Sequence, residues 1–200
     1  MNVADRYING VGSGIWRDSH VKIEGKAVAG LQTSFLIDWY SSRKEFLASD
    51  TYYPILDSQG DNMIQLVTSG PVGQFKDIHL GVLQAISNAK ESVYIQTPYF
   101  IPTDSLMQVI QMAAMRGVDV RLMLPRHSDT TFVHIASMSF LKEVLDAKVS
   151  VYFFEAGFLH SKLMTVDNSL TITGSANMDM RSFEHNFEID AFIYSEETCR

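Results

Sequence analysis

The regular alternation of short apolar segments with longer helical ones is the feature that most constrains the fold of this chain. Apolar residues recur at helical spacing in the longer segments, and β-branched and aromatic residues gather in the short ones. Strands separated by helices of this length indicate a layered α/β fold. The pattern predicts strands at 63–67, 92–97, 118–124 and 149–154, and helices at 78–90, 104–116 and 131–147, with Thr103 as an N-cap and Gly117 as a helix stop.

Residues before this alternation form a separate stretch. A strand is predicted at 18–24 and a long helix at 26–46, followed by a polar connector that contains proline and glycine. The chain has 200 residues, which suits one full domain, or one domain and part of another.

Composition limits the possible functions. The formal net charge is -7, which argues against a non-specific nucleic-acid binder, because such a surface should be basic. The single Cys199 excludes an internal disulfide, and no zinc-type spacing of cysteine and histidine occurs. No run of about eighteen apolar residues is present in the printed sequence.

A dense polar motif lies near the end of the chain and reads H-x-K-x4-D-x6-G-S-x-N. It consists of His160, Lys162, Asp167, Gly174, Ser175 and Asn177. The segment 160–167 is predicted to be a strand, paired through a turn at 167–169 with a second strand at 171–173. Alternate residues of a strand point to the same face, so His160 and Lys162 should project together. Another strand is predicted at 187–194.

These residue types suit the cleavage of a phosphodiester without a metal or other cofactor. Histidine is a nucleophile or proton donor that works near neutral pH. Lys162 would neutralise the non-bridging oxygens, and Ser175 and Asn177 would donate hydrogen bonds to them. The histidine ring also needs an acceptor at its second nitrogen, and Glu188 is the candidate. Asp167 is included in the catalytic set, although it also fits a structural role in the hairpin turn.

The motif resembles that of the phospholipase D superfamily, and further segments are similar to bacterial cardiolipin synthases. The similar segments are 16–25, 94–102, 157–162 and 176–183. The resemblance implies a phospholipase D-like layered α/β/α fold with a mixed sheet. It also implies a division of the chain into the end of a first repeat at 1–52, a linker at 53–62, and a complete second repeat at 63–200.

The family site is built from two H-x-K motifs, whereas this chain has one complete motif. The resemblance implies that Glu188 accepts a hydrogen bond from His160 and orients its ring. Asp18 would orient in the same way a first histidine that the chain lacks. Asn2 would be the first-repeat counterpart of Asn177 and would bind phosphate. The triplet at 20–22 also reads H-x-K, but the rest of the motif does not follow it, so it is interpreted as part of a strand.

The implied activity is phosphatidyl transfer between two phosphatidylglycerol molecules through a phosphohistidine, which gives cardiolipin and glycerol. The sequence leaves open which histidine is the nucleophile. Anionic phospholipid is the expected partner and no nucleic acid is expected. The implied location is the bacterial inner membrane, with the catalytic part on the cytoplasmic side and an anchor upstream. Phe158 and Leu159 are candidates for an acyl-chain entrance.

Two alternatives fit the same residues. The chain could be a one-motif phosphodiesterase or nuclease that completes its site as a homodimer. It could also be a catalytically incomplete half that binds lipid. In the leading interpretation, an upstream repeat with its own H-x-K motif completes the site.

Overall fold

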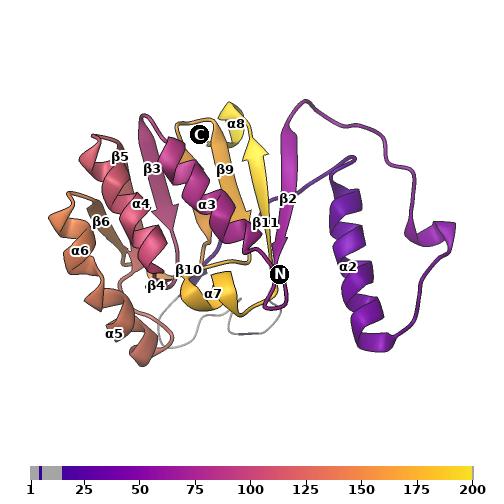
Figure 1. Cartoon of the computed structure of the whole chain (residues 1–200), viewed down its shortest axis with the longest axis horizontal. Coiled ribbons are helices and arrows are strands. Elements are labelled where there is room, and N and C mark those ends of the chain that lie inside the picture. Colours follow the sequence, from indigo (N-terminus) through magenta and orange to yellow (C-terminus); the bar gives the residue numbers. More distant parts are fainter. Residues whose placement is uncertain (1–4, 6–14, 200) are drawn as a thin grey trace.

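The computed structural model describes residue 5 and residues 15–199 (Figure 1). The chain forms a mixed α/β fold around one large sheet. Its strands are β1 (Ile15–Arg17), β2 (Met63–Ser69), β3 (Ser92–Gln96), β4 (Phe100–Ile101), β5 (Asp119–Pro125), β6 (Ser150–Phe154), β7 (Gly157–Leu159), β8 (Leu163–Val166), β9 (Leu170–Gly174), β10 (Met178–Asp179) and β11 (Glu188–Tyr194). Its helices are α2 (Val28–Arg43), α3 (Asp77–Asn88), α4 (Asp104–Met115), α5 (Thr131–Ser139), α6 (Leu141–Asp146), α7 (Met180–Glu184) and α8 (Glu196–Cys199), with a 3-10 turn at Asp50–Tyr52.

Seven strands form the main sheet in the order β2-β11-β9-β8-β3-β5-β6. The strands β3, β5 and β6 are parallel, because helices carry the chain back between them. The other neighbours are antiparallel, and β8 and β9 form a hairpin. The predicted mixed sheet flanked by helices is therefore confirmed.

The core lies between the sheet and α3, α4 and α6, and Figure 1 shows α3 and α4 side by side across one face of the sheet. α3 and α4 lie within two residues of the ends predicted for the helices at 78–90 and 104–116. The Thr103 side chain accepts a hydrogen bond from the Leu106 amide, 3.2 Å away, and so caps α4. Gly117 has φ 92°, a conformation that glycine adopts without strain after a helix.

One predicted helix is divided in two. The segment 131–147 forms α5 and α6, separated at Phe140, instead of a single helix. The Ser139 hydroxyl donates to the Ala136 carbonyl at 2.6 Å, and the Phe140 amide bonds to the Ser137 carbonyl in a tighter turn. A serine that bonds back to the helix backbone bends it, which accounts for the break.

The prediction for the segment after residue 17 is wrong. Residues 18–24 have no strand structure, and the strand in this region is β1, which ends at Arg17. β1 pairs in parallel with β7, where Trp16 lies beside Phe158. The triplet at 20–22 is therefore not part of a strand, and Lys22 forms an exposed ion pair with Glu24 at 3.0 Å.

The helix α2 lies beside the sheet, beyond its edge strand β2 (Figure 1). Within α2 the only buried side chain is Leu36. Phe35 and Ile37 are more than half exposed although both are large apolar residues. A helix with apolar residues around its circumference normally lies within a protein interior, so the surface of α2 is unusual for one that lies outside the core.

Candidate active site

His160, Ser161 and Lys162 lie in an extended segment between β7 and β8. The predicted strand at 160–167 begins only at Leu163, so His160 and Lys162 precede it. The His160 amide instead donates to the Arg17 carbonyl at 2.7 Å and continues the pairing of β7 with β1. Ser161 is fully buried, and its hydroxyl lies 3.0 Å from that of Ser19. The catalytic segment is thus held against the early part of the chain.

The carboxylate beside His160 is Asp18. His160 Nδ1 and Asp18 Oδ2 are 2.9 Å apart, which corrects the assignment of Glu188 to this histidine. Glu188 instead accepts a hydrogen bond from the Asn186 side chain at 2.9 Å. Burial alone would raise the pKa of Asp18, but the hydrogen bond and the charge attraction of His160 lower it below its usual value.

Two aromatic rings lie against the histidine. The Trp16 ring centroid lies 4.9 Å from that of His160, and the Phe158 centroid lies 5.8 Å from it. Phe158 and Leu159 are both buried, with at most 1% of their surface exposed, so they belong to the core and do not line an entrance for acyl chains. Their packing against β1 positions the ring of His160.

Lys162 lies directly against the histidine. Its Nζ is 3.1 Å from His160 Nε2 and donates to the His160 carbonyl at 2.9 Å. Burial lowers the pKa of Lys162 to about 8, although the charges of Asp18 and Glu188 raise it part of the way back. At neutral pH the side chain therefore carries most of its positive charge in a partly buried position, where a charge acts strongly on an anion.

The loop 174–177 contains Ser175 and Asn177, the predicted neutral hydrogen-bond donors, and both form hydrogen bonds to neighbouring residues. Ser175 exchanges hydrogen bonds with Ile189 of β11, since its hydroxyl accepts from the Ile189 amide at 2.9 Å. The Asn177 side chain donates to Ser182 Oγ at 3.3 Å. Asn177 Oδ1 is buried, and no donor among the described residues reaches it. Asn177 is therefore fixed in place by α7, with one polar atom unsatisfied.

Asp167 lies at the hairpin turn, at the opposite end of β8 from His160. Its carboxylate accepts hydrogen bonds from the backbone amides of Lys90, Glu91 and Ser92, at 2.8, 2.8 and 2.9 Å. Its φ of 50°, with 49° at Asn168, places both residues in the left-handed region, within the three-residue turn between β8 and β9. Asp167 therefore serves the hairpin and the start of β3, and it contributes nothing directly to the histidine.

A cavity of about 500 Å³ contains the histidine and lysine. Asp18, His160, Lys162 and Ser175 line it, and apolar side chains of α2 and β2 form part of its wall. Asn2 lies outside the described residues, so its predicted role has no structural counterpart here. The structure thus brings together Asp18, His160, Lys162 and Ser175, and leaves Asp167 elsewhere.

Two further residues support the site, and the second of them, Asp190, was not predicted from the sequence. Ser182 is 1% exposed and accepts from both the backbone amide and the side chain of Asn177. Asp190 lies 4% exposed in β11 and also lines the cavity. An aspartate within the apolar run of β11 is a signal that could have indicated it, because buried carboxylates need a partner.

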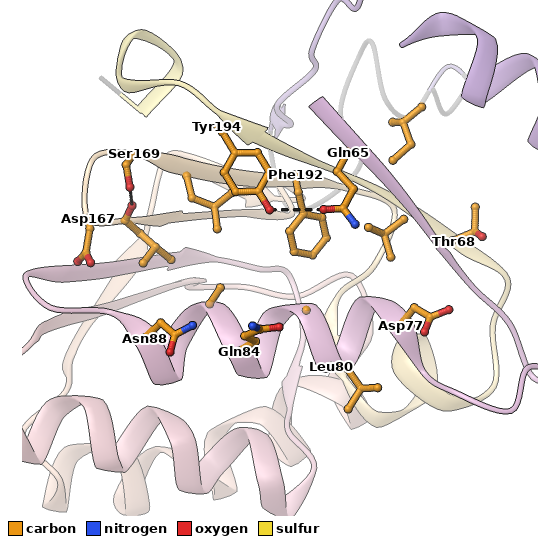
Figure 2. A pocket seen from close by; sticks show the side chains of 16 residues that line it. Gln65, Thr68, Asp77, Leu80, Gln84, Asn88, Asp167, Ser169, Phe192 and Tyr194 are labelled. Carbon is orange, nitrogen blue, oxygen red and sulfur yellow. Dashed lines mark hydrogen bonds between the residues drawn. The ribbon is translucent and has the colours of Figure 1, made fainter. Parts of the chain in front are cut away.

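A second cavity, of about 740 Å³, lies on the side of the sheet that faces α3 (Figure 2). Asp167 and Ser169 lie toward one end of it, and Thr68 and Asp77 toward the other (Figure 2). Its lining includes neither His160 nor Lys162, so it is separate from the cavity that holds the histidine.

The part of the chain that the structure describes contains neither a metal-ligand cluster nor a membrane-spanning helix. No group of three or more histidine, cysteine, aspartate or glutamate side chains there is arranged to hold a metal ion. Within residue 5 and residues 15–199, no helix has both the length and the apolar composition needed to cross a membrane.

The comparisons with known proteins identify the family. Residues 82–200 match the family model described as cardiolipin synthase, phospholipase D-like domain, and the chain belongs to this family. It is 45% identical over 203 residues to cardiolipin synthase 2 of Staphylococcus epidermidis, with all of this chain and 42% of that protein covered. It is 42% identical over 203 residues to cardiolipin synthase of Staphylococcus aureus, with 41% of that protein covered. The chain thus spans about two fifths of the length of these curated relatives.

Solved structures show the same fold. The phospholipase D family member Nuc from Salmonella typhimurium has a TM-score of 0.58 at 23% identity, covering 70% of this chain and 88% of Nuc. Phosphatidylserine synthase from Haemophilus influenzae has a TM-score of 0.53 at 13% identity, covering 69% of this chain and 36% of that one. At these identities the likeness concerns the fold alone.

Proposed function

We propose that the chain supplies one half of the active site of a cardiolipin synthase. The observation that carries this proposal is the contact of Asp18, His160 and Lys162 within one cavity. The similarity to cardiolipin synthases over the whole chain supports phosphatidylglycerol as both donor and acceptor. A membrane location, with the site on the cytoplasmic side, is part of the same proposal.

The geometry at the histidine suits proton transfer. With its Nδ1 proton donated to Asp18, the ring presents Nε2 toward Lys162 and the cavity. Lys162 would move its hydrogen bond from Nε2 to a non-bridging oxygen of an arriving phosphodiester. In this assignment Nε2 takes up a proton from solvent once Lys162 has moved to the phosphodiester, and the resulting imidazolium gives that proton to the glycerol oxygen that leaves phosphorus. His160 then takes the proton of the incoming alcohol, in the second step.

The other histidine would form the bond to phosphorus. A completing repeat or a second copy of the chain would supply it, and phosphorus would pass from the donor lipid to this nitrogen and then to the acceptor alcohol. Asp18 precedes the second repeat yet contacts its histidine. By the symmetry of two repeats, Glu188 would serve the histidine of the first.

The test uses this chain together with the upstream repeat of a cardiolipin synthase, in phosphatidylglycerol vesicles. We expect cardiolipin and glycerol to form, and His160→Ala to lower turnover by about 10²-fold to 10⁴-fold, as for the loss of an acid-base group. His185→Ala is the matched control, because the described contacts of His185 do not involve the cavity. Full turnover by His160→Ala would refute the proposal.

The fold likeness to Nuc makes a one-motif phosphodiesterase the second candidate. The same preparations therefore include the chain alone with a DNA substrate and no metal. Cleavage that depends on His160 and on self-association would favour this candidate. Binding to anionic vesicles with no turnover in any combination would instead favour a lipid-binding half.

A further inference from the structure

Asp190 is a buried carboxylate that the catalytic assignment above does not use. It lies in β11, directly across from Gly174 of β9, and its neighbours Ala191 and Phe192 are buried apolar residues. Removing a carboxylate from water is costly unless the group is paired or hydrogen-bonded. The reason for an aspartate here must therefore lie in what its side chain contacts.

The carboxylate contacts the backbone of the loop 174–177. Asp190 Oδ1 accepts a hydrogen bond from the Ala176 amide at 3.1 Å. Gly174 passes so close that a Cβ at this position would overlap Asp190 Oδ1 and the Ile189 carbonyl. The loop therefore packs directly on the carboxylate, and only glycine leaves room for this approach.

Ala176 lies between the two residues predicted to donate hydrogen bonds to phosphate. Ser175 precedes it and lines the same cavity as Asp190, His160 and Lys162. Asn177 follows it and is held from the other side by Ser182. The bond from Ala176 to Asp190 thus fixes the middle of the loop, while Ile189 and Ser182 fix its ends.

We propose that Asp190 is a positioning residue for phosphate binding, whose carboxylate holds the Ala176 amide and thereby places Ser175 at the cavity of His160. The proposal rests on the proposed function, in which this cavity binds a phosphodiester. Asp190 acts through the loop and does not itself touch the substrate.

The electrostatic surroundings agree with this role. Burial raises the pKa of Asp190 to about 6, the Ala176 amide lowers it part of the way, and the like charge of Glu188 raises it. The cation facing it is Lys162. Above about pH 7 the side chain is therefore ionised, and an ionised carboxylate is the stronger hydrogen-bond acceptor.

The test is a titration of the whole isotopically labelled chain with dimethyl phosphate, followed by NMR. Dimethyl phosphate keeps a single negative charge across neutral pH, so the ligand itself does not titrate. We expect Asp190→Ala to weaken binding about tenfold or more, the equivalent of one hydrogen bond to a charged group. Asp190→Asn keeps an acceptor oxygen for Ala176 and should restore most of the binding.

Thr171→Val is the matched control. Thr171 is also buried in this sheet and its hydroxyl lies 3.2 Å from Cys199 Sγ, away from the loop. Its loss should leave dimethyl phosphate affinity unchanged. Equal affinity of folded Asp190→Ala and wild type would overturn the proposal for Asp190 alone. Absence of binding by the wild type would overturn the phosphate site itself, and this proposal with it.

If Asp190→Ala does not fold, the comparison of the wild type with Asp190→Asn carries the test. The Ala176 amide resonance of the wild type should shift with pH around the Asp190 pKa of about 6, because protonation weakens the acceptor. Asp190→Asn should show no such transition. An Ala176 resonance that does not respond between about pH 3 and pH 8 in the wild type, or that responds equally in Asp190→Asn, would overturn the proposal.

Discussion

Burial and hydrogen bonding leave the side chains of His160 and Lys162 few alternative arrangements. The Nζ of Lys162 lies 3.1 Å from His160 Nε2, while the Asp18 carboxylate is hydrogen-bonded to the other ring nitrogen, Nδ1. The lysine therefore occupies the place beside Nε2 that a phosphate oxygen would take, and substrate would replace one of its hydrogen bonds. Because the lysine is partly buried, its charge state controls the site.

Phosphate binding should weaken as pH rises above the Lys162 pKa. This pKa is lowered by burial to about 8, so the ammonium loses its proton above that value, and a neutral amine attracts the anion less. A dimethyl phosphate titration from about pH 7 to about pH 9.5 measures the effect. Lys162→Arg remains charged over this range and should show a flat profile. A flat profile in the wild type would contradict the prediction.

At neutral pH, Asp190 should lower the free energy of unfolding. Its pKa of about 6 lies above the ordinary value of 3.8, so the folded state binds the proton more tightly than the unfolded chain does. The stabilisation this provides is complete below pH 3.8 and is lost as pH rises through about 6.

Asp190→Asn should therefore raise the free energy of unfolding by about 1–3 kcal/mol at neutral pH and change it little near pH 4. Urea unfolding at the two pH values measures the difference. An equal change at both values would show that ionisation of Asp190 is not its cause.

At the scale of elements, two short structures stabilise the strands and the loop that carry the site residues. The turn between β8 and β9 fixes the hairpin through Asp167, whose carboxylate bonds to three amides at the start of β3. The helix α7 begins at Met180, where Asp179 accepts from the Ser182 amide at 2.6 Å and so caps it. Through Ser182 this capped turn holds Asn177.

Asp167→Ala should destabilise the fold and leave the site intact in the molecules that remain folded. Three amides lose their acceptor, and alanine is strained at a φ of 50°, so we expect a loss of about 2–4 kcal/mol. Chemical denaturation measures it, and Asp146→Ala is the control, since the Asp146 side chain forms an exposed ion pair with Lys142. Weaker dimethyl phosphate binding by folded Asp167→Ala would indicate a direct role instead.

At the scale of the whole molecule, a compact sheet domain carries a loosely attached helix. α3 and α4 pack on the sheet with buried side chains such as Ile78 and Leu106, whereas α2 buries only Leu36. The segment before α2 nevertheless contributes Asp18 to the site through the pairing of β1 with β7. The early part of the chain is therefore required for the site, although it lies outside the sheet domain.

Amide hydrogen exchange should show this difference directly. In the dilute chain we expect α2 to exchange much faster than α4, because few buried contacts oppose its opening. Mass spectrometry of the exchanged peptides at several protein concentrations measures it. Protection of α2 that grows with concentration would mean that a second copy covers it. Equal protection of α2 and α4 in the dilute chain would contradict the prediction.

Local sequence patterns by themselves determined the alternating elements, the Thr103 cap, the Gly117 stop and the hairpin turn at Asp167. Each of these depends on contacts between residues close in the chain, which periodicity and turn chemistry encode. The motif also indicated His160 and Lys162, because their spacing and chemistry are local. Only the tertiary structure decided that Asp18, 142 residues away, contacts His160 in place of Glu188. It likewise decided that Asp190 supports the loop 174–177. Both contacts arise from strand pairing between distant segments, and no local pattern specifies which distant carboxylate a strand will bring close.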